Sequence, residues 1–155
     1  MPATSAGLLL WRQGDDGIEV LIVHPGGPFW ARKQQGAWSI PKGEFDPEAE
    51  DGPAAAAREF TEELGSPAPP QPWIDLGETV LKSRKRIVAW GVRGDLDVDS
   101  IESNTFTMQW PPKSGRTIEV PEVDEARWVT PDDAADLLNP AQVVFVERLV
   151  AAACD

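Results

Sequence analysis

Residues 43–65 read GEFDPEAEDGPAAAAREFTEELG, and the second half of this stretch predicts a helix. Asp51 or Gly52 is suited to the N-cap position, and Pro53 to the first turn, where its missing N–H costs least. The alanine run that follows favours helix strongly, because alanine loses no side-chain entropy there. Gly65 is typical of the residue that ends a helix, so we expect the helix to stop at this point.

The predicted helix has an apolar face and a separate acidic face. With a turn of about 100° per residue, one side carries Ala57, Phe60 and Leu64. The acidic arc carries Glu59, Glu62 and Glu63. These carboxylates repel one another, and only Arg58 offers local relief, by pairing with Glu62 one turn on. The pattern predicts a hard divalent cation, Mg²⁺ or Mn²⁺, bound over the acidic face, with a plain solvated helix face as the alternative.

The stretch resembles the Nudix box of the Nudix hydrolase family. That box has a glycine, five residues, a glutamate, seven residues, and then Arg-Glu, an apolar residue, any residue, Glu-Glu, any residue and Gly. Here Glu50 is followed, after seven residues, by REFTEELG at residues 58–65. The chain departs from the box in two places: six residues separate Gly43 from Glu50, and Ser66 replaces an apolar residue. The preceding WSIPKG, residues 38–43, is also similar to the family.

The resemblance implies the Nudix α/β/α sandwich, an α/β fold with a mixed central sheet, in a single domain over residues 1–155. Strands are predicted over residues 5–12, 18–24, 38–40, 74–82, 86–92, 105–110 and 126–129. Residues 41–43 predict a turn before the box. Two later helices are predicted, over residues 130–138 and from about residue 140 onward. This order independently suggests a mixed sheet with helices on both faces.

The resemblance also implies roles for the residues of the box. The metal ligands it implies are Glu59, Glu63 and the backbone carbonyl of Gly43. Glu62 is either a further ligand or the residue that activates the attacking water. Arg58 orients the glutamates by bidentate pairing with Glu50 or Glu62. Glu50 is in turn an orienting residue rather than a ligand.

Further candidates lie outside the box. Glu122 stands six residues before Trp128, where relatives often place an extra carboxylate that serves as base or ligand; a charged loop is the alternative. Lys42 either touches a phosphate or is a solvated turn lysine. The only basic cluster of the chain, which includes Lys82 and Arg84, either steers a polyphosphate or forms a solvated hairpin tip.

Aromatic residues offer weaker signals. The chain has seven tryptophans, of which Trp30, Trp90 and Trp110 are candidates for a platform that stacks on a base. For each of them, a place in the core is the favoured alternative. The single histidine, His24, precedes a Pro-Gly-Gly turn and is predicted to pack at the end of a strand.

Composition narrows the class of protein. The net charge of −12 and the pI of about 4.4 argue against nucleic acid or an anionic membrane as the main partner. A single cysteine, Cys154, excludes a disulfide within the chain, and with one histidine it excludes a Cys/His zinc site. The chain has no signal or membrane segment, so we expect a cytoplasmic protein.

The family resemblance implies a Mg²⁺-dependent pyrophosphohydrolase that acts on a small nucleotide, with a homodimer as a common arrangement among relatives. Nucleoside triphosphates and dinucleoside polyphosphates are the two best substrate classes, and the sequence does not choose between them. A non-catalytic nucleotide-binding domain on the same fold is the second hypothesis. A Ca²⁺-stabilised structural protein is the third, suggested only by the alternating acids of residues 95–99.

Overall fold

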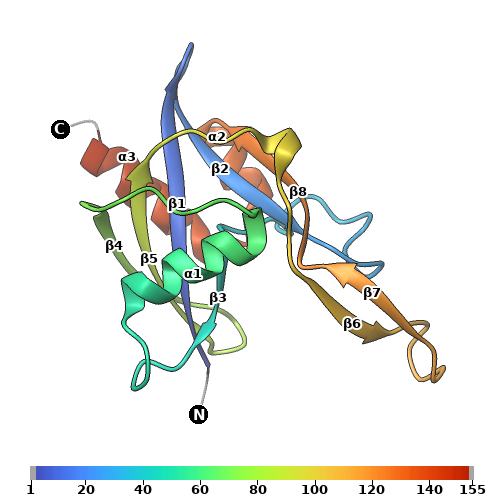
Figure 1. Ribbon diagram of the computed structural model, residues 1–155. Coiled ribbons are helices and arrows are strands. Elements are labelled where there is room, and N and C mark those ends of the chain that lie inside the picture. Colours follow the sequence, from blue (N-terminus) through green and yellow to red (C-terminus); the bar gives the residue numbers. More distant parts are fainter. Residues whose placement is uncertain (1–2, 154–155) are drawn as a thin grey trace.

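The computed structural model describes residues 3–153, so Cys154 lies outside the described residues. Six strands form one mixed sheet in the order β4-β5-β1-β2-β8, and β3 also pairs with β1 (Figure 1). The strands of this sheet are β1 Thr4–Gly14, β2 Gly17–Pro25, β3 Lys42–Phe45, β4 Ile74–Val80, β5 Arg86–Arg93 and β8 Val123–Val129. β1 runs antiparallel to β2 and β3 but parallel to β5, which makes the sheet mixed as predicted.

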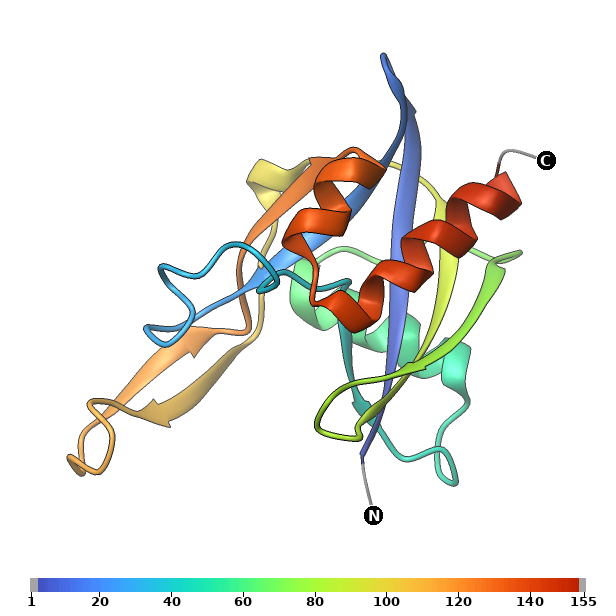
Figure 2. The same ribbon diagram turned by 180° about the vertical axis from the view of Figure 1, so that it is seen from behind.

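Helices cover both faces of the sheet. The helices are α1 Gly52–Leu64, α2 Pro131–Leu137 and α3 Val143–Ala153. α1 lies on one face, and α2 and α3 lie on the other (Figures 1 and 2). Each face has its own buried apolar cluster, one around Phe60 of α1 and one around Phe145 of α3. The α/β sandwich expected from the sequence is therefore confirmed.

α1 begins and ends where the sequence predicts. The Asp51 carboxylate accepts a hydrogen bond from the N–H of Ala54, and Gly65 adopts a left-handed conformation with φ of 77°. The apolar face differs slightly from the prediction, because Ala55 and Ala56 are fully buried while Ala57 is only half-buried. The small alanine side chains let the helix backbone lie close to the sheet.

The strand before the box lies later in the chain than predicted. Residues 38–40 make only isolated bridges, of which one joins Ser39 to Val23. The strand is instead β3, in the segment predicted as a turn, and it pairs antiparallel with Thr4–Gly7. The local Pro-Lys-Gly signal for a turn was overridden because β1 offers an unpaired edge at this point.

A two-stranded ribbon projects from the sheet (Figures 1 and 2). It consists of β6 Thr105–Gln109, which was predicted, and β7 Thr117–Pro121, which was not. The strand after it, β8, starts three residues earlier than predicted, at Val123. Two short 3₁₀ helices, Val98–Ser100 and Pro140–Gln142, complete the elements. Within residues 3–153, no helix combines the length and the apolar character needed to cross a membrane.

Candidate active site

β3 and α1 bring the glutamates of the box against the start of the strand. Glu59 is only 7% exposed, and its carboxylate lies directly over Gly43, where a Cβ atom would collide with it. The backbone N–H of Lys42 donates a hydrogen bond of 3.3 Å to Oε1 of Glu63. The geometry thus places Glu59, Gly43 and Glu63 together, despite the extra residue in the loop before the helix.

Arg58 connects the acids of the box to one another. It donates two hydrogen bonds to the Glu50 carboxylate, of 2.9 and 3.0 Å. Its Nη1 donates to Glu59 at 2.8 Å and to Glu62 at 3.3 Å. The hydrogen bonding between Arg58 and Glu50 lowers the pKa of Glu50. It is also the main cause of the raised pKa of Arg58. The bidentate partner of Arg58 is therefore Glu50, one of the two candidates that the sequence left open.

The pKa values of three carboxylates of this region are raised. Burial raises the pKa of Glu63 to about 8, against the opposing charge of Lys42. Burial and then the charge of Glu62 raise the pKa of Glu59, although Arg58 counteracts them. Burial and the charge of Glu62 likewise raise the pKa of Glu122. The region holds more negative charge than its own cations neutralise, which is typical of a site for a positively charged ligand.

Backbone hydrogen bonds carry Glu122 to the C-terminal end of α1. The N–H of Asn104 donates to the carbonyl of Glu62 at 2.8 Å, and the N–H of Glu122 donates to the carbonyl of Asn104 at 2.8 Å. The N–H of Gly26 then donates to the carbonyl of Glu122 at 3.2 Å. Glu122 is distant in sequence from α1, yet this chain of bonds sets it beside the box. Sequence reasoning had no signal for the part that Asn104 plays, because only its backbone takes part.

The carboxylate and carbonyl oxygen atoms of this region are suitable ligands for a hard divalent cation. They are the carboxylates of Glu59, Glu62, Glu63 and Glu122 and the carbonyl of Gly43, all oxygen ligands of the kind Mg²⁺ prefers. Gly43 also provides the close approach that a side chain would block. Among residues 3–153, no three acidic, His or Cys side chains are already arranged around one point as metal ligands.

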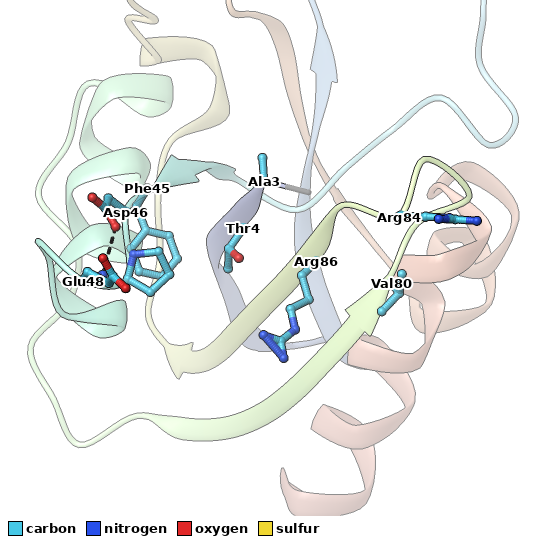
Figure 3. A pocket seen from close by; sticks show the side chains of 9 residues that line it. Ala3, Thr4, Phe45, Asp46, Glu48, Val80, Arg84 and Arg86 are labelled. Carbon is cyan, nitrogen blue, oxygen red and sulfur yellow. Dashed lines mark hydrogen bonds between the residues drawn. The ribbon is translucent and has the colours of Figure 1, made fainter. Parts of the chain in front are cut away.

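The basic residues predicted to bind substrate lie apart from these carboxylates. Arg84 and Arg86 line a cavity of about 730 Å³ with Phe45, Thr4 and others, and no carboxylate of α1 is among its lining residues (Figure 3). Asp46 and Glu48 also line it, so its charges are nearly balanced. Lys82 is exposed and is not among the lining residues of this cavity. Of the predicted substrate contacts, Lys42 alone is beside the box.

His24 is buried at the edge of this region, and the sequence analysis assigned it to packing alone. It is 3% exposed, with Nδ1 at 2.9 Å from Oδ1 of Asp124 and Nε2 at 2.7 Å from the carbonyl oxygen of Lys33. Its ring also packs against Trp38, with centroids 5.2 Å apart. His24 therefore connects the loop of residues 26–37 to β8 at Asp124, which stands two residues after Glu122.

We expect His24→Leu to lower the free energy of unfolding by about 2 kcal/mol, because the Asp124 carboxylate and the Lys33 carbonyl lose the ring nitrogens that contact them. Urea unfolding followed by tryptophan fluorescence measures this change. Lys33→Ala is the matched control, because the bond to Lys33 uses its backbone carbonyl and survives the substitution. A His24→Leu protein as stable as the control would contradict the role of the two bonds.

Comparison with known proteins identifies the family of the chain. The sequence matches the family described as NUDIX domain over residues 1–149. Similar solved structures include a C. elegans Ap4A hydrolase in a binary complex, with 21% identity, a TM-score of 0.68 and 98% of each chain covered. The NUDIX domain of Shewanella oneidensis NrtR, complexed with ADP ribose, has 13% identity and a TM-score of 0.66, covering 99% of this chain and 89% of that chain.

A MutT protein from Methanosarcina mazei Go1 is similar as well, with 20% identity and a TM-score of 0.61, covering 99% of this chain and 97% of that chain. At these identities the three structures establish the fold, and the match of the family over nearly the whole chain establishes the relationship. The chain therefore belongs to the NUDIX domain family, whose hydrolases act on phosphorus-containing anhydrides.

Proposed function

We propose that this protein is a Mg²⁺-dependent pyrophosphohydrolase that cleaves a pyrophosphate bond in a nucleotide. The observation that carries the proposal is the crowding of Glu59, Glu63 and Glu122, whose pKa values are all raised by burial. A structural surface would gain nothing from burying several acids together, whereas a cation there turns their repulsion into ligation. Bound Mg²⁺ supplies polarisation of the phosphoryl group and lowers the pKa of a water molecule.

The residues of the chain divide this chemistry among them. Glu59, Glu63 and the carbonyl of Gly43 would hold the cation, with Glu62 as a further oxygen donor. Arg58 keeps Glu62 and Glu59 oriented through its bonds to both, and its bidentate bonds to Glu50 hold Arg58 itself. These bonds make Arg58 and Glu50 positioning residues.

Glu122 is the candidate for the group that accepts a proton from the attacking water. It lies on a different segment from the metal ligands of α1, and its raised pKa brings it closer to the pH at which a general base works best. Glu62 remains the other candidate for this role. The side chain of Lys42, whose backbone N–H donates to Glu63, is the candidate contact for a phosphate oxygen.

The proposal is tested by a turnover panel with Mg²⁺ that covers nucleoside triphosphates and dinucleoside polyphosphates, with identification of the products. Among the similar structures, the Ap4A hydrolase is a reason to include dinucleoside polyphosphates in the panel. The NrtR domain complexed with ADP ribose keeps open the second hypothesis, a domain that binds a nucleotide without cleaving it. Calorimetric binding of a nucleotide with no product formed would favour that second hypothesis.

We expect the affinity for Mg²⁺ to rise with pH by about tenfold per unit and to level off above about pH 8. The reason is that Glu63, with a pKa of about 8, holds a proton in the metal-free protein at neutral pH. The cation binds the ionised form, so binding must release this proton, and raising the pH removes that cost. Calorimetry at pH 6 to 9 in buffers of different ionisation enthalpy measures both the affinity and the protons released. An affinity independent of pH would contradict the assignment of Glu63.

A further inference from the structure

Large apolar side chains are unevenly exposed on this molecule. Among residues 3–153 the four exposed large hydrophobic residues are Phe29, Val80, Phe106 and Ile118, with exposed fractions of 56%, 56%, 42% and 37%. Three of them lie at one end of the molecule, on loop 26–37 and on the ribbon of β6 and β7. Figures 1 and 2 both show this loop and the ribbon at the same end. Such a concentration of exposed apolar surface marks a binding surface more often than chance.

One face of the ribbon is apolar throughout. The register pairs Phe106 with Val120 and Met108 with Ile118, and partners across a strand pair point to the same face. This face meets loop 26–37 at Gly27, where a Cβ atom would lie 3.6 Å from Met108 and 3.7 Å from Val120. The loop and the ribbon therefore meet at Gly27, and we call the apolar residues that these two segments leave exposed or half-exposed the apolar wall: Phe29, Trp30, Phe106 and Ile118.

The loop presents its aromatic rings in a fixed arrangement. Phe29 and Trp30 pack edge to face, with centroids 5.0 Å apart. The ammonium group of Lys33 lies 3.7 Å from the centroid of Phe29 and 5.3 Å from that of Trp30. The buried His24 holds the backbone of the loop at Lys33. The rings are thus held in place beside a cation, with much of the Phe29 ring open to solvent.

The apolar wall is attached directly to the proposed catalytic residues. Glu122 follows the last residue of β7, and its carbonyl accepts the hydrogen bond from Gly26 at the start of the loop. At the other end of the ribbon, Asn104 precedes β6 and is bonded to Glu62. The segments that carry the wall are therefore hydrogen-bonded to Glu62 and Glu122 of the proposed site.

We propose that the apolar wall binds the base of the nucleotide whose phosphates lie at the box. This inference rests on the proposed function and adds the residues that bind the base. Every base has a flat aromatic face that can stack on Phe29 or Trp30, whichever hydrogen-bonding groups the base carries at its edge. The positive charge of Lys33 suits the phosphate that follows the base and ribose.

The cavity of Figure 3 is the competing place for a base, because it contains Phe45 and two arginines. Phe45, however, packs against the buried cluster beneath α1. Arg86 is already paired with Glu78 at 2.8 Å. None of the candidate metal ligands lines the cavity. In contrast, the loop and the ribbon that carry the wall are hydrogen-bonded to the backbone of Glu122 and Glu62. The wall is therefore the better site.

The test compares substrates with and without a base. Phe29→Ala and Phe106→Ala are assayed with Mg²⁺ on the common nucleoside triphosphates and on inorganic tripolyphosphate. We expect kcat/KM for the best nucleotide to fall about tenfold, mainly through KM, because one stacking contact is lost. Turnover of tripolyphosphate should stay within about twofold of wild type. Val80→Ala tests the competing site, since Val80 is as exposed as Phe29 but lies on β4 and lines the cavity of Figure 3.

Several results would overturn the inference. Equal losses on both kinds of substrate would show that the wall does not read the base. A loss of base preference in Phe45→Ala, with Phe29→Ala unchanged, would move the base to the cavity. Sedimentation showing that Phe29→Ala dissociates a dimer, with the base preference intact, would make the wall an interface between two copies.

The inference and the proposed function fail in different ways. If the wild-type protein cleaves neither substrate, the same variants are compared by calorimetric binding of ATP and of tripolyphosphate. An affinity for ATP that falls about tenfold in Phe29→Ala, with the affinity for tripolyphosphate unchanged, would support the wall although hydrolysis is absent. Equal affinities of the variant and the wild-type protein for ATP would refute the wall.

Discussion

Replacing Glu63 by Gln is expected to lower kcat by at least about 10²-fold, because the amide keeps the shape of the side chain but removes an anionic oxygen ligand. Glu63 is held in place by the N–H of Lys42, so the substitution changes charge more than position. Turnover of the best nucleotide at saturating Mg²⁺ measures the effect. The loss should persist at high Mg²⁺, since the defect lies in the chemical step as well as in metal binding.

Glu48→Gln is the matched control for this experiment. The substitution also removes one negative charge from the stretch of residues 43–65. The side chain of Glu48, however, is exposed, and its backbone N–H donates a hydrogen bond to Asp46. We expect its kcat to stay within about twofold of wild type, as is usual for an exposed surface substitution. Nearly full activity in Glu63→Gln would remove this glutamate from the metal site, and equal losses in both variants would point to a general charge effect.

Gly43→Ala is expected to lower kcat/KM by about 10²-fold, because a displacement of about 1 Å at a reacting centre is enough for such a loss. The added methyl group would collide with the carboxylate of Glu59. Gly43 does not adopt a positive φ, so alanine is compatible with the backbone there, and the defect should come from the displaced carboxylate. Kinetics combined with calorimetric Mg²⁺ titration would show affinity and activity falling together.

Glu44→Ala provides the comparison for Gly43→Ala, because it alters the next residue of β3 at an exposed side chain. Urea unfolding of both variants separates a local effect from a loss of the fold. Full activity of Gly43→Ala would mean that Glu59 has room to retreat without loss of function, which would exclude Glu59 from the ligand set.

The position of β3 shows where prediction from sequence failed. Its Pro-Lys-Gly start signals a turn, and nothing within the segment itself indicates a strand. The strand forms because Thr4–Gly7 offers backbone partners that lie far away in the sequence. β7 was missed for a related reason, since its short TIEV pattern becomes a strand only opposite β6.

For the side chains near the box, too, one part of the arrangement could be predicted from the sequence and another part could not. The spacing of Glu59, Glu62 and Glu63 was readable from the helical period. Their burial was not, and burial is the main cause of the raised pKa of Glu59 and Glu63. The basic cluster around Arg84 looked like a contact for phosphates, yet the structure sets it on a cavity that the candidate metal ligands do not line.

The sequence by itself determined α1, its caps and the arc of acids, because a helix is specified by neighbours within a few residues. It also determined the family through the spacing of the box. Only the tertiary structure decided how Gly43 meets Glu59, how Glu122 reaches the end of α1, and how the ribbon stands beside loop 26–37. These placements depend on backbone pairing and burial between segments that are far apart in the chain, and no local pattern encodes such pairing.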